Sequence, residues 1–197
     1  MMRRILAGLL IAAALPVAMA ADAQSNMRAE QFGKDKPSAA PKSEVRRLVL
    51  RSQGLSIIGP GLPVPIRATF DAPRAEAIKM VSSIRGAPTK SGRVEDCGSG
   101  TPMDFVTFRG LELYFIEGKF VGWYLDEAIP PALSTVKGIG VGSTRAAFRA
   151  AYPTATIDET SLGTEYDSDD AGSGVFDSAR PNAKISTMWA GQTCIAR

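Results

Sequence analysis

The stretch from residue 105 to residue 125 constrains the fold most, because three short apolar runs are separated there by two tight turn signals. The runs and the turns between them are Phe105–Phe108, Arg109-Gly110, Leu111–Ile116, Glu117-Gly118 and Phe120–Leu125. Two-residue connections that end in glycine are typical of β-hairpins, because glycine readily adopts the positive φ angles that these turns need. The stretch therefore predicts a three-stranded antiparallel meander.

Short amphipathic helices are predicted on both sides of this meander. In the second helix, Ser143 supplies an N-cap oxygen, and Pro153 ends the helix because proline lacks the N–H that continuation requires. The apolar stripe of this helix consists of Ala147, Phe148, Ala151 and Tyr152. The first helix has a weaker stripe, which consists of Ala77, Ile78, Val81 and Ile84.

The order of these elements predicts an α+β fold of two tandem units, each a short helix packed on an antiparallel β-meander. Unit one is expected to span residues 44–131 and unit two residues 132–197. In unit one, the glycine- and serine-rich segment 91–102 is interpreted as a loop. In unit two, the polar run 166–174 is interpreted as a solvated hairpin loop, and strands are expected at 136–141, 155–158, 175–177 and 184–190.

The N-terminus has the composition of an export signal. A pair of arginines precedes the apolar run Ile5–Val17, and Ala18-Met19-Ala20 forms a cleavage site of small residues. The apolar run is shorter than the roughly 20 residues that span a bilayer. We therefore expect a signal peptide over residues 1–20, a periplasmic or secreted protein, and no membrane span after cleavage. Residues 21–43 contain few apolar side chains and are predicted to form a flexible tether.

Cys97 and Cys194 are the two cysteines of the sequence. An exported chain meets an oxidising compartment, so a disulfide between them is predicted. In the chain-entropy model, closing a loop of this length stabilises the fold by about 4–5 kcal/mol. The alternative, a reactive thiol, has no histidine anywhere in the chain to lower its pKa.

The residue types present exclude several kinds of chemistry. Histidine is absent, so His-based nucleophilic triads and His-ligated zinc sites are impossible. The run Gly138–Gly142 precedes a helix. The G-x-G-x-x-G pattern of a dinucleotide-binding loop would need its third glycine at position 143, which is a serine. The run Asp167–Gly172 resembles a calcium loop, but Ala171 and Ser178 occupy positions where ligands are needed. We therefore expect no cofactor and no metal, and the formal net charge of +3 gives no indication of a nucleic-acid partner.

The aromatic residues of the meander predict a partner surface. If Glu117-Gly118 is a two-residue turn, Phe115 faces Phe120, and counting back places Glu112 opposite Trp123. The more apolar face is then expected to cover the first helix. The other face carries Phe105, Tyr114 and Trp123. These residues are expected either to bind a partner or to pack against unit two.

Two groups of residues carry a resemblance to known proteins. They are Glu95-Asp96-Cys97-Gly98 with Gly110-Leu111 and Gly118-x-Phe120-x-Gly122-Trp123, and Gly138-x-Gly140-Val141-Gly142-Ser143-Thr144 with Ala190-Gly191-x-x-Cys194. Over most of residues 46–197 the chain resembles a family of uncharacterised exported bacterial proteins, some labelled aspartate-semialdehyde dehydrogenase. The tandem order of elements is also similar to the SmpA/OmlA and β-lactamase-inhibitor-protein fold. This fold-level resemblance implies a binding or assembly role, and neither resemblance implies catalytic residues.

The leading functional hypothesis is a non-enzymatic, exported binding or envelope-accessory protein with an envelope protein as its partner. The alternative is a small periplasmic hydrolase that uses paired carboxylates or a Ser–Lys dyad. Dehydrogenase chemistry would need a free nucleophilic cysteine and a nucleotide domain, and the sequence indicates neither. A deep polar cleft with two close carboxylates would favour the hydrolase, and an open sheet face with aromatic side chains would favour the binder.

Overall fold

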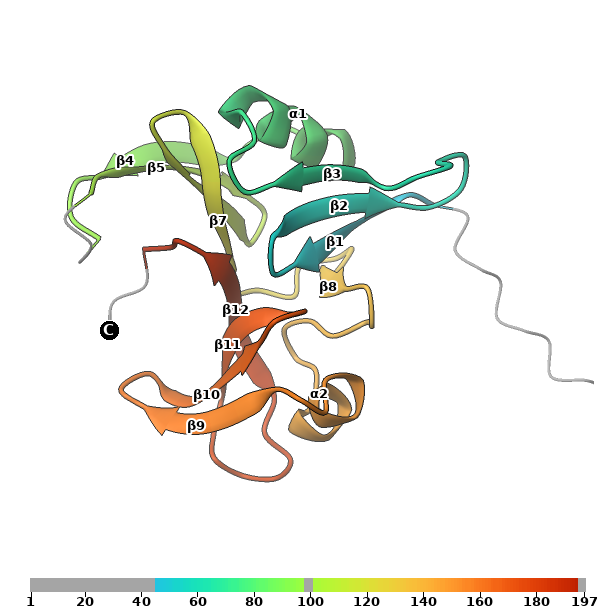
Figure 1. Ribbon diagram of the computed structural model, residues 1–197, viewed down its shortest axis with the longest axis vertical. Coiled ribbons are helices and arrows are strands. Elements are labelled where there is room, and N and C mark those ends of the chain that lie inside the picture. The colour runs from blue at the N-terminus through green and yellow to red at the C-terminus, as the bar shows by residue number, and fades with distance from the viewer. Residues whose placement is uncertain (1–44, 98–100, 195–197) are drawn as a thin grey trace, which may run out of the picture. The chain divides into compact units, whose positions relative to one another are not determined.

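The computed structural model describes residues 45–97 and 101–194, and within these residues the chain forms two β-sheets and two α-helices (Figure 1). The smaller sheet has the order β3-β2-β1-β8 and consists of β1 (Arg47–Arg51), β2 (Gly54–Ile58), β3 (Ile66–Thr69) and β8 (Ser134–Thr135). The larger sheet has the order β4-β5-β6-β7-β12-β11-β10-β9 and consists of β4 (Lys90–Val94), β5 (Met103–Phe108), β6 (Leu111–Ile116), β7 (Lys119–Leu125), β9 (Thr156–Thr160), β10 (Gly163–Ser168), β11 (Gly172–Phe176) and β12 (Ile185–Gly191). The helices are α1 (Arg74–Arg85) and α2 (Arg145–Ala151). The described fold is mainly β, with two helices, and agrees with the α+β class.

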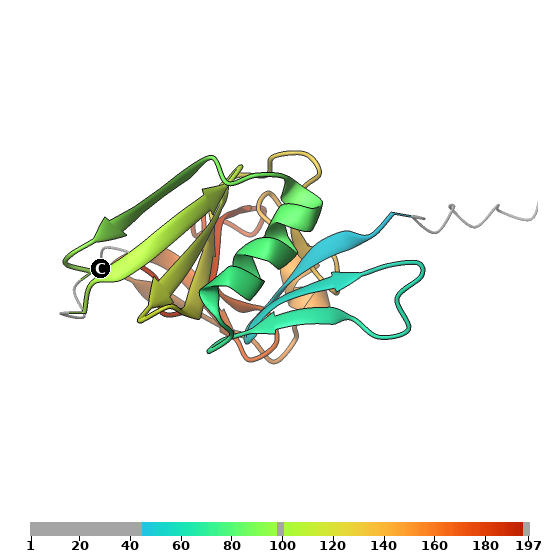
Figure 2. The ribbon, with the colours of Figure 1, turned by 90° about the horizontal axis from the view of Figure 1, so that it is seen from above.

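Both helices and the smaller sheet lie on one side of the larger sheet, which we call its inner face (Figure 1). Helix α1 lies between the smaller sheet and strands β5 and β7, as Figure 2 shows. Strand β12 pairs with β7 in the middle of the larger sheet, where Ala190 lies opposite Trp123. The strands that follow α1 and the strands that follow α2 therefore form one continuous sheet.

The meander predicted from residue 105 to residue 125 is present as β5, β6 and β7. Its two turns place Arg109 and Glu117 at φ angles of 44° and 49°, each followed by a glycine with positive φ. The second turn has the predicted length, because Ile116 lies opposite Lys119 and Phe115 opposite Phe120. The two-residue turns are confirmed.

A β-bulge changes the register immediately beyond that turn. Between Tyr114 and Phe115 the pairing shifts, so that Val121 is an extra residue on β7 and Tyr114 lies opposite Gly122. Trp123 consequently lies opposite Leu113, whereas the predicted register places Glu112 opposite it. A shift of one residue exchanges the faces of a strand, so Trp123 lies on the inner face. The predicted face assignment of Trp123 is wrong for this reason.

Side chains of the inner face, α1, α2 and the smaller sheet form one buried core. On the larger sheet, alternate residues of neighbouring strands enter it, as expected for a sheet that is covered on one face. The core residues with the largest fully buried side chains are Trp123, Tyr166, Phe108, Phe115, Phe120, Phe148, Leu50, Leu55, Leu111, Leu113 and Leu125.

Helix α2 covers the part of the larger sheet that is formed by β10 and β11. The ring centroid of Phe148 lies 4.1 Å from that of Tyr166 and 5.8 Å from that of Phe176. Thr144, and not the predicted Ser143, is the N-cap, because its side-chain oxygen accepts the N–H of Ala147. The hydroxyl of Ser143 instead accepts the N–H of Gly140. Of the predicted stripe, Phe148 and Tyr152 are buried, whereas Ala147 is exposed.

Replacing Phe148 with alanine is expected to lower the free energy of unfolding by about 3 kcal/mol, because the ring is fully buried among three other aromatic rings. Arg149 follows it on the exposed side of α2, and Arg149→Ala is the matched control with an expected change within about 0.5 kcal/mol. Chemical denaturation monitored by circular dichroism measures both. Equal midpoints for the two variants would contradict this orientation of α2.

Three predicted segments differ from the structure. The predicted loop 91–102 contains most of β4, where the lack of a side chain at Gly92 lets the ring of Phe105 lie close to the backbone. The predicted strand 136–141 is a turn in which the N–H of Gly138 donates to Thr135. The predicted loop 166–174 forms parts of β10 and β11. Because the segment is mostly polar, its sequence does not show the alternation of buried and exposed residues that places Tyr166 in the core.

The chain enters both helices through the same kind of backbone contact. Before α1, the bonds are Asp71 N–H to Phe120 O (2.8 Å), Phe120 N–H to Ala72 O (2.9 Å) and Arg74 N–H to Gly118 O (2.8 Å). Before α2, they are Gly142 N–H to Ile185 O (2.8 Å), Ile185 N–H to Ser143 O (2.9 Å) and Arg145 N–H to Ala183 O (2.8 Å). Helix α1 therefore starts beside the beginning of β7, and helix α2 starts beside the beginning of β12.

The predicted signal peptide and tether lie outside the described residues. Within residues 45–97 and 101–194, neither helix has the length and apolar content that a membrane crossing requires.

Candidate functional site

Trp123, predicted to belong to a partner surface, is a core residue. Its side chain is fully buried, and its indole N–H donates to the backbone carbonyl of Arg51 at 2.9 Å. Arg51 is the last residue of β1, so Trp123 connects the larger sheet to the smaller one. The bulge at Val121 is the physical reason, because it turns Trp123 towards the core.

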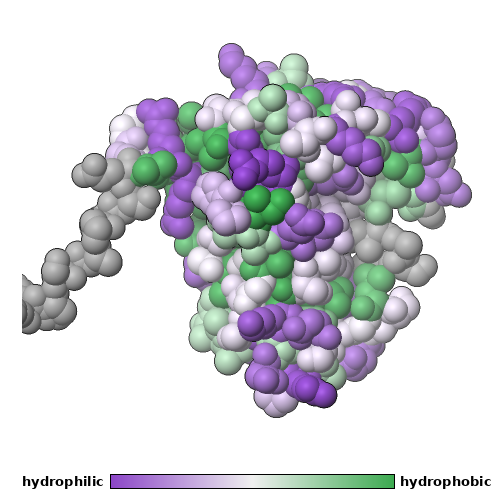
Figure 3. Space-filling model, turned by 180° about the vertical axis from the view of Figure 1, so that it is seen from behind, coloured by the Kyte–Doolittle hydropathy of each residue, from purple (hydrophilic) through white to green (hydrophobic). Residues whose placement is uncertain are grey.

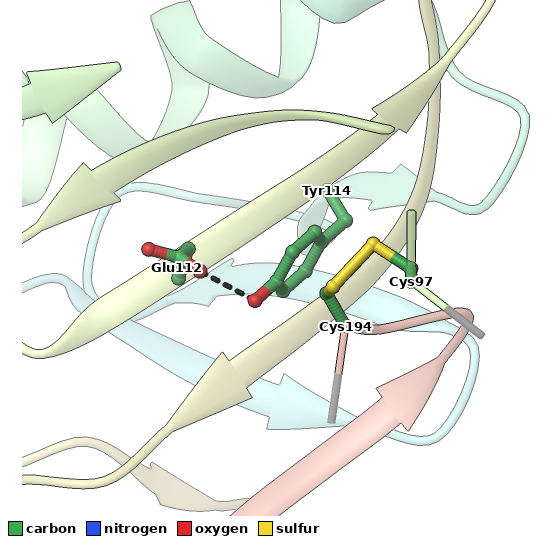
Figure 4. Close-up of a disulfide and its surroundings, with 4 residues drawn as sticks. All are labelled: Cys97, Glu112, Tyr114 and Cys194. Atoms are coloured by element: carbon green, nitrogen blue, oxygen red, sulfur yellow. Dashed lines mark hydrogen bonds between the residues drawn. A yellow bond between two sulfur atoms is a disulfide. The ribbon is translucent and has the colours of Figure 1, made fainter. Parts of the chain in front are cut away.

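Tyr114 lies on the outer face of the larger sheet, as predicted, but only 4% of its surface is exposed. The disulfide packs beside its ring, as Figure 4 shows. Phe105 lies opposite Tyr114 and is half-buried, with the amine of Lys90 5.2 Å from its ring centroid. Phe105, Tyr114 and Trp123 therefore do not form one exposed aromatic surface.

The predicted disulfide between Cys97 and Cys194 is confirmed, with a Cα–Cα distance of 4.9 Å. Cys97 follows β4, and Cys194 follows β12 through residues 192–194, which we call the C-terminal strap. Strands β5, β6 and β7 lie between β4 and β12 in the sheet, so the connection spans their outer face. The strap lies so close to β7 that a Cβ on Gly122 would be only 2.0 Å from the carbonyl oxygen of Gln192.

The carboxylate of Glu112 accepts hydrogen bonds from two hydroxyl groups close to this disulfide. Thr107 Oγ1 donates to one carboxylate oxygen at 2.9 Å, and the hydroxyl of Tyr114 donates to the other (Figure 4). Burial raises the pKa of Tyr114 well above its ordinary value, and the hydrogen bond to Glu112 raises it further. The phenol therefore stays protonated at neutral pH. This arrangement satisfies polar groups under the strap and offers no tyrosinate nucleophile.

A cavity of about 380 Å³ opens beside the start of β1 and the end of α1. The segment that follows the third meander strand, residues 131–133, forms its remaining wall. This volume lies in the range of about 300–1,000 Å³ that is typical of small-molecule sites. The cavity is lined by Val45, Arg46, Arg47, Leu48, Ile84, Arg85, Pro131, Ala132 and Leu133. We call it the Arg85 pocket.

Arg85 is the buried charge of this pocket, with only 8% of its surface exposed. Its Nη1 donates to the carbonyl of Pro131 at 2.7 Å, and its Nη2 donates to the carbonyl of Arg109. Its buried Nε–H has no acceptor among the described residues, and no described carboxylate forms an ion pair with it. Burial lowers the pKa of Arg85 from its ordinary value, and the charge of Arg109 lowers it further.

The lining of the Arg85 pocket contains arginine and apolar side chains, with no hydroxyl, thiol or carboxylate among the described residues that form it. Nucleophilic and general acid–base catalysis both need such groups, because guanidinium neither attacks nor accepts a proton near neutral pH. The pocket can therefore attract and enclose a ligand, and the described side chains that line it supply no reactive group.

A second cavity, of about 200 Å³, is more polar and includes Arg51, Ser56, Arg67 and Asp170. The hydroxyl of Ser56 is fully buried and accepts a hydrogen bond from Nε of Arg51 at 2.6 Å. An arginine that donates to a serine oxygen does not remove its proton, so this contact does not activate Ser56 as a nucleophile.

Metal-binding geometry is also not found in the part of the chain that the structure describes: no group of three or more Cys, Asp or Glu side chains there could hold an ion. Asp167, the first residue of the calcium-like run, lies in β10 and accepts a hydrogen bond from Ser173 at 2.6 Å. The run thus belongs to a hairpin and not to a calcium loop.

Seen from behind, hydrophobic and hydrophilic side chains are interleaved, and the hydrophobic ones form separate patches (Figure 3). No single broad apolar area of the described residues marks a partner surface on that side. The comparisons point to no relative either: the chain matches no protein-family model, no curated protein and no solved structure.

The Arg85 pocket is not among the sites predicted from the sequence. Its lining comes from three separate segments, 45–48, 84–85 and 131–133, which only the fold brings together. The one local signal is an arginine that follows an apolar helix stripe, and a last-turn arginine is common because it interacts favourably with the helix dipole. Neither that residue nor its neighbours form a recognisable motif.

Proposed function

We propose that this chain is an exported binding protein without catalytic activity, built from two tandem units that each place a short helix on an antiparallel meander. Binding proteins of this kind enclose a ligand or accompany an envelope partner. The proposal is supported by the arrangement of the helices and strands, by the chemistry of the Arg85 pocket and by the disulfide.

The tandem arrangement is supported by backbone contacts that recur in the same order. The bonds that join Asp71, Ala72 and Arg74 to Phe120 and Gly118 correspond one for one to those that join Gly142, Ser143 and Arg145 to Ile185 and Ala183, at the start of β7 and of β12 respectively. The sheet order has the same pattern on both sides, since β4-β5-β6-β7 meets β12-β11-β10-β9 at a central pair of last strands. Two copies of one helix-then-meander unit, related by an approximate two-fold axis, would produce this pattern.

The observation that carries the binding role is the lining of the Arg85 pocket. It combines enclosed apolar surface with fixed positive charge, and the described residues that form it include no group for nucleophilic or acid–base chemistry. The disulfide is compatible with an exported protein, because such bonds persist in oxidising compartments. The rival hydrolase would need a carboxylate pair or a Ser–Lys dyad in a cavity, and neither the Arg85 pocket nor the contact of Ser56 supplies one.

The test is to fill the pocket without disturbing the core. Ala132 is exposed and lines the pocket, so Ala132→Phe is expected to occupy part of its volume; Ala146→Phe, at an exposed position of α2, is the matched control. After incubation with an envelope extract, native mass spectrometry is expected to detect a bound small molecule on the oxidised protein and on Ala146→Phe. That adduct is expected to be absent from Ala132→Phe.

Chromogenic ester, peptide and glycoside substrates provide the second part of this test. Turnover is expected to remain at the rate without protein for all three classes. Turnover by the oxidised protein that survives purification to homogeneity would establish the hydrolase and overturn the proposal. Absence of any adduct from the oxidised protein would remove the pocket as its support.

A further inference from the structure

We propose that the Arg85 pocket takes a single-chain amphipath with an anionic head group, its head beside the arginines and its chain against the apolar wall. This inference rests on the proposed binding function and specifies the class of ligand. Three properties of the pocket support it: its uncompensated charge, its apolar wall and its open side.

The charge of Arg85 is not neutralised within the described residues. Two backbone carbonyls satisfy part of its guanidinium, but they carry partial charges only, and the Nε–H remains without an acceptor. A buried charge that lacks an opposite charge is costly, because the low-dielectric interior replaces water poorly. An anion in the pocket would offset that cost. The lowered pKa of Arg85 agrees with an environment that currently disfavours its charge.

Two further arginines line the same pocket on its exposed side. Arg46 and Arg47 lie at the start of β1, and their side chains are exposed. Among the described residues, neither forms an ion pair with a carboxylate, and Nε of Arg46 contacts the carbonyl of Pro60 at 3.4 Å. The described residues that line the pocket thus include three arginines and no acidic residue. Arginine is well suited to carboxylate and phosphate groups because its N–H groups form a fork.

The rest of the wall is apolar. Leu48 and Leu133 are buried, Ile84 is half-buried, and Pro131 and Ala132 add apolar surface near the opening. Val45, also in the lining, is 71% exposed. An inorganic anion would leave this apolar surface in contact with water, whereas an acyl chain would cover it, which is favourable in proportion to the apolar area buried. The combination therefore selects an amphipath over a simple ion.

The test measures binding of four probes that share a ten-carbon chain, by isothermal titration calorimetry on the oxidised full chain. The probes are decanoate, decyl phosphate, decanol and decyltrimethylammonium, all below their micelle concentrations. Decanoate or decyl phosphate is expected to bind at least about tenfold more tightly than decanol, a difference of about 1.4 kcal/mol. Decyltrimethylammonium is expected to bind most weakly. The ratio between the two anions distinguishes a carboxylate from a phosphate head group.

Salt and variants separate the charge from the apolar wall. Raising the ionic strength is expected to weaken binding of the anions and not of decanol, because salt screens exposed charges. Arg47→Ala is expected to reduce the preference for the anions severalfold, whereas Arg149→Ala, on the surface of α2, is expected to leave it unchanged. Arg85→Lys keeps the charge and Arg85→Met removes it; the preference is expected to persist in the first and to be lost in the second. Because Arg85→Met leaves two carbonyls without a donor, Arg47→Ala keeps the test decisive if that variant does not fold.

Three results would overturn the inference. If decanol binds as tightly as the anions, the pocket is apolar only, and the proposed binding function survives without this ligand class. If no probe binds to the folded protein while the envelope extract still gives an adduct, the ligand belongs to another class. If a synthetic peptide of residues 24–43 binds and displaces decanoate, the occupant is a segment of this chain. Failure of both the probes and the extract counts against the binding function itself.

Discussion

Trp123→Ala is expected to lower the free energy of unfolding by about 4 kcal/mol, in the upper part of the range for core substitutions. The indole is fully buried in the core, and its N–H donates to the carbonyl of Arg51. Alanine would leave a cavity between the two sheets and a carbonyl without its donor. Denaturant titration monitored by circular dichroism measures the loss.

Tyr124→Ala is the matched control, because Tyr124 is the next residue of β7 and lies half-buried on the opposite face. Its expected loss is well below that of Trp123→Ala. Trp123→Phe separates the two contributions of the indole, since it keeps most of the ring volume and removes the donor. If the alanine variants at 123 and 124 have the same midpoint, the bulge does not set the register described above.

Loss of the disulfide is the second large effect. The double substitution Cys97→Ser with Cys194→Ser is expected to destabilise the protein by about 4–5 kcal/mol in the chain-entropy model, because the bond joins residues 97 positions apart. The strap would also be released from the outer face, where it covers Tyr114. Denaturation midpoints of the oxidised protein, the reduced protein and the double variant provide the measurement.

The reduced protein is the control for the serine side chains, since it lacks the bond but retains both sulfur atoms. Reduced protein and double variant are expected to unfold at similar denaturant concentrations, both below the oxidised protein. Intact mass before and after alkylation establishes the redox state. Two alkylated thiols in protein taken directly from an oxidising compartment would contradict the disulfide, and coincident midpoints for all three would contradict its contribution to stability.

Local signals in the sequence predicted some elements well and others poorly. The hairpin turns at Arg109-Gly110 and Glu117-Gly118 have specific chemistry, so the meander was predictable. The bulge at Val121 has no such signal, because one additional residue changes neither composition nor turn type. Strand β4 was missed because glycine and serine resemble a loop. For β4 the deciding contact is that of Phe105 with Gly92, which lies on a neighbouring strand.

The candidate site was less predictable than the fold. An exposed aromatic surface required the correct register, and the bulge moved Trp123 into the core while the strap covered Tyr114. The Arg85 pocket required the positions of three segments separated by dozens of residues, together with the absence of a carboxylate near a buried arginine among the described residues. Neither property can be inferred from residue types alone, whereas the pairing of two cysteines could be.

The central position of β12 determines when this molecule can be completed during its synthesis. Residues 185–191 are made after every other described strand, yet they pair with both β7 and β11. Until they are available, each of these strands has a free edge that can pair with another chain, and such edges promote aggregation. Cys194 lies three residues further on, so the covalent link waits for the same event. Sheet closure and cross-linking are therefore late, coupled steps, and a chain released shortly before residue 185 would have a cysteine without its partner and two unprotected strands.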